Sequence, residues 1–224
     1  MLKKMIKLFQ KEETFDEKKL YQMYGDCDLV QGSATILIIA DTHGTLHEDE
    51  FADFLQKNPN YDICIMLGDH LPRDIDIILK YVEKRKIYGI LGNHDYDYLS
   101  DYGITNIHGR IMNIHGIKIL GMEGSFKYKP SSFPSFTHEE SIEFLEMFPK
   151  VDLLVSHDQR FHPERINDPA HQGLKGITKY LYQNKVPIHI HGHIHENYEK
   201  TMFNHTKEIS VFGYRIVQIN NKEI

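Results

Sequence analysis

Short apolar, β-branched runs recur along the chain and alternate with segments of helical periodicity. Residues 35–40, 61–67 and 86–91 read as buried strands, and helices are predicted between them at residues 48–57 and 72–85. A strand–helix–strand–helix–strand order of this kind indicates a sheet with parallel strands. The first half of the chain therefore predicts an α/β fold.

The second half of the chain extends the same pattern. A hairpin is predicted at residues 111–121, with His115 and Gly116 as its turn. Thr137 and Glu140 match a capping box, which predicts a helix running to about Met147. Further strands are expected at residues 152–156, 187–191, 208–212 and 214–219, and a further helix at residues 174–184.

Length and composition exclude several classes of protein. The chain has 224 residues, 41% hydrophobic and 26% charged, without a repeat or linker, so we expect one globular domain over residues 1–224. No apolar run approaches the ~18 residues that a membrane-spanning helix needs. Cys27 and Cys64 cannot form a disulfide framework, which favours a reducing, cytoplasmic location. A formal net charge of −6 argues against an extended nucleic-acid-binding face.

The N-terminal residues carry an amphipathic pattern of their own. Four apolar residues share one face of a helix predicted at about residues 1–12, and four lysines lie off that face. Lys7 interrupts the apolar run and no small-residue cleavage site follows, so this segment is not a secretory signal peptide. We expect the helix to dock on the domain, and a position on a membrane surface is the alternative.

Polar residues of metal-binding types directly follow five of the predicted strands. Ligands of α/β sheets bind at the carboxyl ends of strands, so these loops are expected to meet at one edge of the fold. One such segment alone is an ordinary polar turn, but the agreement of five is hard to obtain by chance. The segments are Asp41-Thr42-His43, Gly68-Asp69-His70, Gly92-Asn93-His94-Asp95, Ser156-His157-Asp158 and Gly192-His193-Ile194-His195.

These residue types indicate the chemistry of the site. Carboxylate, imidazole and amide oxygen together suit divalent Mn, Fe, Zn, Co or Ni. Seven candidate ligands are too many for one ion and about right for two. Two ions ~3.5–4 Å apart need a shared carboxylate, and Asp69 is the predicted bridge. Such a pair lowers the pKa of a bound water and holds the oxygens of a transferring phosphoryl group.

The order of the five segments, from Asp41 to His195, resembles the calcineurin-like metallophosphoesterase family. The resemblance implies an α/β fold in which two β-sheets pack as a sandwich flanked by helices. It also implies a binuclear-metal phosphoesterase, with Mn²⁺ as the first choice of ion, in which a metal-activated water attacks a small phosphate ester. A phosphodiester and a phosphomonoester both remain open as substrates.

The resemblance further implies a role for each matching residue. His94 would be the general acid or a donor to the phosphate, and Asp95 would orient and polarise its imidazole. The first metal would be bound by Asp41, His43 and His195, and the second by Asn93, His157 and His193, with Asp69 bridging the two.

Departures from the family's motifs indicate which subfamily the chain resembles. The Asp-Arg-Gly extension of the family's protein phosphatases is missing after Asp69, and so is the extra domain of its DNA-repair nucleases. Asp41-Thr42-His43-Gly44 instead resembles the opening of the compact bacterial phosphoesterases. Arg160 and His171 follow the motifs closely enough to be candidate substrate contacts.

Two other segments each allow more than one interpretation from the sequence. The loop at residues 126–134, rich in aromatic residues, lysine and proline, is either a lid over the substrate or an ordinary packed surface loop. His189 and His191 alternate with isoleucines on a strand, and we expect them in the core or behind the ligands rather than on the metals.

Two classes of function remain from the sequence. The first is the hydrolase, and the second is a binding protein that keeps the fold without the chemistry, as a retromer subunit of this fold has done. A nuclease is a third possibility. Scaffolds of this fold tend to lose ligand or acid histidines, whereas this chain keeps all of them, His94 included. The sequence therefore favours the enzyme.

Overall fold

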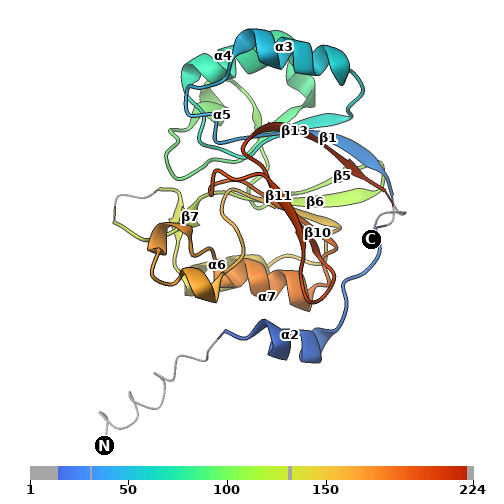
Figure 1. The fold of residues 1–224 in the computed structure, drawn as a ribbon, viewed down its shortest axis with the longest axis vertical. Coiled ribbons are helices and arrows are strands. Elements are labelled where there is room, and N and C mark those ends of the chain that lie inside the picture. Colours follow the sequence, from blue (N-terminus) through green and yellow to red (C-terminus); the bar gives the residue numbers. More distant parts are fainter. Residues whose placement is uncertain (1–14, 31, 131–132, 221–224) are drawn as a thin grey trace, which may run out of the picture.

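Two β-sheets lie face to face, and helices cover the outer face of each (Figure 1). The computed structural model describes residues 15–30, 32–130 and 133–220, so the helix expected at residues 1–12 lies outside the described residues. The predicted α/β sandwich is confirmed. None of the helices in the described part of the chain has the length and apolar character needed to cross a bilayer.

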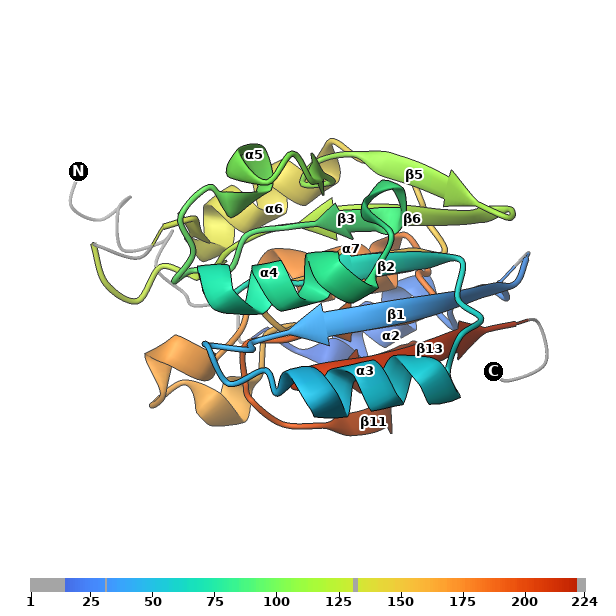
Figure 2. The same cartoon turned by 90° about the horizontal axis from the view of Figure 1, so that it is seen from above.

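The first sheet holds the opening strands of the chain. Its strand order is β13-β1-β2-β3-β4, and all neighbours are parallel except β13, which runs antiparallel to β1. Helices α3 and α4 cover its outer face (Figure 2). The elements are β1 (Ala34–Ala40), α3 (Glu48–Lys57), β2 (Ile63–Met66), α4 (Pro72–Tyr81), β3 (Ile87–Gly89), α5 (Tyr98–Asp101), β4 (Thr105–Asn106) and β13 (Gly213–Ile219).

The second sheet has the order β11-β12-β10-β9-β6-β5. Its inner strands are parallel, and antiparallel strands close both edges. Helices α6 and α7 cover its outer face, and α2 lies against α7 (Figure 1). The elements are α2 (Glu17–Tyr24), β5 (Ile111–Ile114), β6 (Ile117–Met122), α6 (His138–Glu146), β9 (Leu153–Ser156), α7 (Lys175–Gln183), β10 (Ile188–His191), β11 (Tyr198–Thr201) and β12 (Lys207–Ser210), with a small separate pair, β7 (Ser125–Phe126) and β8 (Ser135–Phe136).

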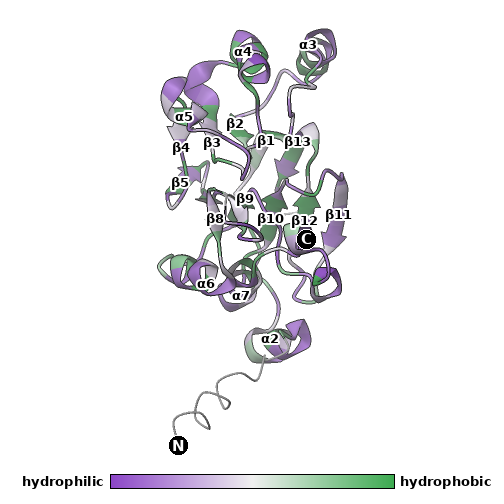
Figure 3. Cartoon of the chain, turned by 90° about the vertical axis from the view of Figure 1, so that its left-hand side faces the viewer, coloured by the Kyte–Doolittle hydropathy of each residue, from purple (hydrophilic) through white to green (hydrophobic). Residues whose placement is uncertain are grey.

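The apolar core has a layer on each side of strand β1. Ile36 and Ile38 point into the layer between the sheets, whereas Leu37 and Ile39 point toward α3 and α4. A strand buried on both faces is apolar at every position, which explains the unbroken apolar run in the sequence. The apolar colouring of the central strands in Figure 3 follows this arrangement. Both sheets contribute side chains to the layer between them.

Most predicted elements are present with small shifts of their ends. The hairpin forms as predicted, and the Thr137–Glu140 capping box starts α6. The helix predicted at residues 72–85 ends earlier, at Tyr81, because Val82 is buried and takes an extended conformation. The helix α2 and the short elements α5, β4, β7, β8 and β11 were not predicted, since segments of this length carry little periodicity.

Candidate metal centre

The polar segments after the strands meet at one edge of the sandwich, where loops from both sheets come together. Two groups of side chains there hold their ligand atoms within 4.8 Å of one another. The first group is Asp41, His43 and His195, and the second is Asp69, His157 and His193. The structure therefore brings together six of the seven predicted ligands in the two sets that the motif order implied, and Asn93 joins the second set.

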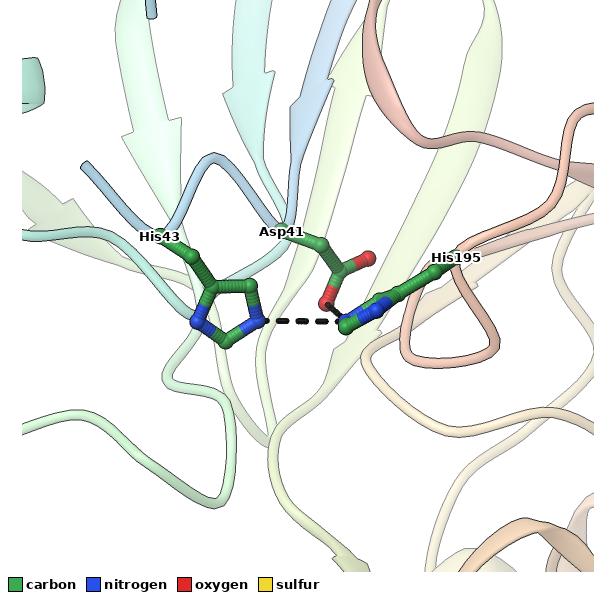
Figure 4. A group of neighbouring side chains, drawn as sticks. All are labelled: Asp41, His43 and His195. Carbon is green, nitrogen blue, oxygen red and sulfur yellow. Dashed lines mark hydrogen bonds and ion pairs between the residues drawn. The ribbon is translucent and has the colours of Figure 1, made fainter. Parts of the chain in front are cut away.

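The first group surrounds one carboxylate oxygen (Figure 4). The Nε2 atoms of His43 and His195 are 3.2 Å apart, and His195 Nε2 lies 3.9 Å from Asp41 Oδ1. Asp41 Oδ2 accepts a hydrogen bond from the backbone N–H of His193 at 2.7 Å. Asp41 Oδ1 is buried without a hydrogen-bond partner among the described residues. A cation between the three side chains would satisfy that oxygen.

The second group is built around His157. Its Nδ1 donates to the carbonyl oxygen of Leu67 at 2.8 Å, which leaves the lone pair on Nε2. That Nε2 lies 3.0 Å from Asn93 Oδ1 and 3.6 Å from Asp69 Oδ2. Burial lowers the pKa of His157 to about 4, so the imidazole is neutral at neutral pH. A bare nitrogen that faces two oxygens is arranged to bind a cation.

Asp69 lies between the two groups. Its Oδ2 is 3.6 Å from His43 Nε2 and also 3.6 Å from His157 Nε2. Its Oδ1 accepts the backbone N–H of His94 at 3.0 Å. Although burial favours the neutral acid, His157 and the His94 amide hold the pKa of Asp69 below its usual value. Asp69 is therefore a carboxylate placed equally for both groups.

The remaining ionisable groups fit metal binding as well. Burial, reinforced by the neighbouring charge of Asp69, raises the pKa of Asp41 well above its ordinary value. Burial and the nearby His43 lower the pKa of His195, which favours the neutral imidazole that metals bind. Two carboxylates this close repel each other, and divalent cations between them remove that repulsion.

The backbone of the ligand loops is strained. Five of the predicted ligands have positive φ, a region that costs a non-glycine residue about 1–2 kcal/mol. Strain of this kind concentrates at functional sites, where the surrounding structure maintains it. The residues are Asp41 (52°), His43 (43°), Asp69 (59°), His193 (69°) and His195 (51°).

Two glycines allow the carboxylates to approach. A Cβ on Gly92 would lie 2.1 Å from Asp69 Oδ1, and a Cβ on Gly192 would lie 2.5 Å from Asp41 Oδ2. A side chain at either position would force the carboxylate or the loop to shift. The glycines that precede Asn93 and His193 in the motifs are therefore required by packing against the two carboxylates.

His94 lies at the mouth of the site, whereas the Asp95 carboxylate binds backbone amides instead of the His94 ring. The imidazole of His94 is exposed, and its centroid lies 6.1 Å from that of His43, at the mouth of the site. The Asp95 carboxylate instead accepts the backbone N–H groups of Asp69 (2.7 Å), His70 (2.9 Å) and Gly92 (2.7 Å). The structure corrects the expectation that Asp95 orients His94, because three amides already occupy its carboxylate. Asp95 holds the two loops that carry Asp69 and Asn93.

The two candidate substrate contacts, Arg160 and His171, lie in different surroundings. Arg160 is turned away from the strand-end loops, because its Nε donates to Glu208 Oε2 at 3.1 Å and its Nη1 pairs with Glu17. This pairing gives no support to a substrate contact by Arg160, which stays a prediction. The ring of His171 lies 5.4 Å from that of His193, and its Nδ1 is 2.9 Å from Asp168 Oδ2. His171 therefore borders the site.

Supporting contacts around His43 carry no signal in the sequence. Thr42 Oγ1 is 2.8 Å from Nδ1 of the buried His70, which joins the loops after β1 and β2. The buried carboxylate of Asp74 accepts the backbone N–H groups of Gly44 (2.6 Å) and Leu46 (3.2 Å). Asp74 reads in the sequence as an ordinary acidic residue in the first turn of α4, so this role was missed.

A family model described as calcineurin-like phosphoesterase matches residues 34–197. The chain belongs to the calcineurin-like phosphoesterase family. Membership of this family and the two ligand groups support a metal-dependent phosphoesterase. The resemblance seen in the motifs is thereby confirmed.

Similar proteins come from several organisms. An uncharacterized protein of Haemophilus influenzae is 25% identical over 201 residues, covering 73% of this chain and 84% of that protein. The structure of phosphopantetheinyl hydrolase from Mycobacterium tuberculosis is 15% identical, with a TM-score of 0.59, and covers 82% of this chain and 95% of that one. TT1561 of Thermus thermophilus is 13% identical, with a TM-score of 0.58, and covers 84% and 99%. These structures share the fold of this chain.

Proposed function

We propose that the protein hydrolyses a small phosphate ester, a mono- or diester, at a centre of two divalent metal ions. The position of Asp69 carries this proposal, since its Oδ2 is 3.6 Å from an imidazole nitrogen of each ligand group. One carboxylate oxygen placed equally between two sets of ligands is what a shared bridge requires. The ions would be held by Asp41, His43 and His195 on one side and by Asn93, His157 and His193 on the other, with Asp69 between them.

The residues present fit this cofactor. Asp41 Oδ1 in the first group is buried and accepts no hydrogen bond from the part of the chain that the structure describes, and His157 offers a bare nitrogen to the second group. Mixed carboxylate, imidazole and amide ligands suit divalent Mn, Fe, Zn, Co or Ni. Among these ions the resemblance to the family makes Mn²⁺ our first choice. When bound, two such ions supply Lewis acidity toward phosphoryl oxygens and lower the pKa of water.

His94 is the residue we assign to the phosphate ester itself. Its backbone is fixed by the hydrogen bond from its N–H to Asp69 Oδ1 at 3.0 Å, while its exposed ring faces the ring of His43. An imidazole in this position donates a proton to the leaving oxygen, or donates a hydrogen bond to the phosphate. His171 borders the second group and is proposed as a weaker contact to substrate.

The expected substrate is small, and the expected compartment is reducing. The formal net charge of −6 gives no electrostatic attraction for a long polyanion. Cys27 and Cys64 are both free thiols, which supports a cytoplasmic location.

The proposal is tested by locating the ions and screening substrates. Anomalous scattering from crystals of Mn²⁺-loaded protein should give two peaks at the strand-end loops, one on each side of Asp69. The same preparation should hydrolyse members of a panel of aryl and alkyl phosphate mono- and diesters. A single fully occupied peak beside Asp69 would refute the binuclear centre. Two peaks with no hydrolysis of any ester would instead favour a non-catalytic scaffold.

A further inference from the structure

A second cluster of metal-binding side chains lies on the other face of the second sheet. His189 and His191 are on β10, and Glu208 is on the neighbouring strand β12, opposite His189 in the parallel register. All three side chains are fully buried, and their ligand atoms lie within 4.8 Å of one another. Ile188 and Ile190 point into the core between the sheets, so the two histidines point the other way, toward the layer of α7 and α2.

Hydrogen bonds fix which nitrogen of His189 carries the proton. The Ser156 hydroxyl donates to the carbonyl oxygen of Asp158 at 2.6 Å, so it has no second proton to give. His189 Nε2, 2.7 Å from that hydroxyl, must therefore be the donor. In the neutral imidazole that burial favours, the lone pair is then on Nδ1, which is buried without a partner among the described residues.

Hydrogen bonds also fix which nitrogen of His191 carries the proton. Its Nδ1 donates to the carbonyl oxygen of Gly192 at 3.0 Å, which leaves the lone pair on Nε2. That Nε2 lies 3.6 Å from Glu208 Oε1. The hydroxyl of Tyr198 reaches the same nitrogen at 3.2 Å, a long contact at the border of the cluster.

His162 adds a fourth group. Its Nδ1 donates to Glu164 at 2.8 Å, and its buried Nε2, without a hydrogen-bond partner among the described residues, lies 3.8 Å from Glu208 Oε1. Glu208 Oε1 also has no hydrogen-bond partner among the described residues, and Arg160 binds the other oxygen of that carboxylate. The ligand atoms of His189, His191 and Glu208 thus lie within 4.8 Å of one another, and His162 Nε2 lies beside the same Glu208 oxygen. Among the described residues, the hydrogen-bond donor at this cluster is the Tyr198 hydroxyl.

Buried acceptors that face one another are costly, because each has lost water and gained no donor. A divalent cation removes this cost. In tetrahedral zinc sites, nitrogen and oxygen ligands at about 2.0–2.1 Å from the ion are separated by about 3.3 Å. Glu208 Oε1 is 3.6 Å from His191 Nε2 and 3.8 Å from His162 Nε2, so each of these two pairs would have to close by about 0.3–0.5 Å. Each imidazole also has its second nitrogen held by an oxygen, as zinc-binding histidines do.

We propose that His162, His189, His191 and Glu208 form a third metal site, closed and structural, with Zn²⁺ as the ion that fits it. Four protein ligands leave no open coordination position, which is typical of structural rather than catalytic zinc. The site is separate from the strand-end centre and does not depend on it. Arg160 links Glu208 to Glu17 of α2, so the ion would also anchor α2 to the sheet.

Burial gives the proposal a readout independent of activity. The side chains of His189, His191 and Glu208 are inaccessible to water, whereas that of His195 in the strand-end centre is 50% exposed. A chelator should therefore strip the strand-end ions quickly and this ion slowly. After brief treatment of the full chain with EDTA, about one zinc per chain should remain.

Two measurements test the third site. Anomalous scattering at the zinc edge from Zn²⁺-loaded crystals should show a peak between His189 Nδ1, His191 Nε2 and Glu208 Oε1, distinct from any peak beside Asp69. In the chelation assay, His189→Ala should lose the retained zinc, whereas His108→Ala, which removes another largely buried imidazole, should keep it.

The outcomes separate this site from the proposed function. Absence of a peak at the cluster would mean that protons or a water molecule satisfy these atoms, and would overturn the proposal even if the strand-end peaks are present. Equal zinc retention in the two variants would overturn it as well. If His189→Ala does not fold, the position of the peak in the unaltered protein still decides.

Discussion

Gly192 offers a direct test of how closely the strand-end loops are packed. The residue precedes His193 and lies against the Asp41 carboxylate, where an added Cβ would be 2.5 Å from Oδ2. Its φ is not in the left-handed region, so Gly192→Ala adds a methyl group without demanding an unusual backbone conformation. The effect of the substitution should therefore arise mainly from the carboxylate, since the next nearest atom outside it, the Ala40 Cβ, is 3.1 Å from the added Cβ.

The magnitude follows from the distances. Ordinary van der Waals contact begins at 3.4 Å, so the carboxylate oxygen or the added methyl group must retreat by 3.4 − 2.5 = 0.9 Å. A retreat of that size disrupts the 2.7 Å hydrogen bond from the His193 N–H and exceeds the ~0.2 Å tolerance of a metal–ligand bond. Loss of a hydrogen bond to a charged group costs about 1.5–3 kcal/mol, which corresponds to metal binding weaker by about 10- to 100-fold.

The assay is a chelator-competition titration of Mn²⁺, with a second glycine as control. Gly213 has a φ of 83° and open space around its Cβ position, so Gly213→Ala should lower stability by about 1–2 kcal/mol and leave Mn²⁺ affinity unchanged. If Gly192→Ala bound Mn²⁺ within about threefold of the unaltered protein, the carboxylate would not be confined as the distances indicate.

Four further predictions address other residues. Asp69→Asn should release both strand-end ions and lower turnover at least about 100-fold, and elemental analysis with both ions retained would contradict the bridge. His94→Ala should keep the ions and slow esters with poor leaving groups by about 10²–10⁴-fold, but slow activated aryl phosphates less; a uniform loss would instead favour electrostatic stabilisation by His94. Burial lowers the pKa of His108 to about 4, against about 6.5 when unfolded, so stability present above pH 6.5 is lost as the pH falls toward 4. In urea titrations between pH 6.5 and pH 4, the free energy of unfolding of His108→Asn should fall by up to about 3 kcal/mol less than that of the unaltered protein. An equal fall in both proteins would refute this prediction. Generic duplex DNA should bind weakly because the net charge is −6, and submicromolar, salt-sensitive binding would contradict the preference for small esters.

The parts of the fold that the sequence predicted are those set by local rules. The strand β1 is apolar at every position because both of its faces are buried, and α6 begins where Thr137 and Glu140 satisfy each other's backbone groups. The ligand loops were predictable for a related reason. Parallel strands align their carboxyl ends, so polar residues after several strands must gather at one edge.

The parts that the sequence could not predict depend on which way a side chain turns. Arg160 lies close in sequence to His157, yet its partners are Glu17 and Glu208, 143 and 48 residues away. Asp95 is adjacent to His94, yet it binds amides of the β2 loop. Both directions are decided by packing between distant segments, which no local pattern records. The approach of His162 to Glu208 of β12 was hidden in the same way.

The left-handed backbone at five ligand positions has a consequence for how such a chain changes over generations. At Asp41, His43, Asp69, His193 and His195, glycine would relieve about 1–2 kcal/mol of backbone strain per position, so the backbone of the unliganded chain is more strained with these ligands than with glycine. Selection for the bound ions therefore acts against selection for stability at the same five codons. In a lineage that no longer used the metals, these positions would be among the first to drift, and toward glycine or asparagine rather than at random.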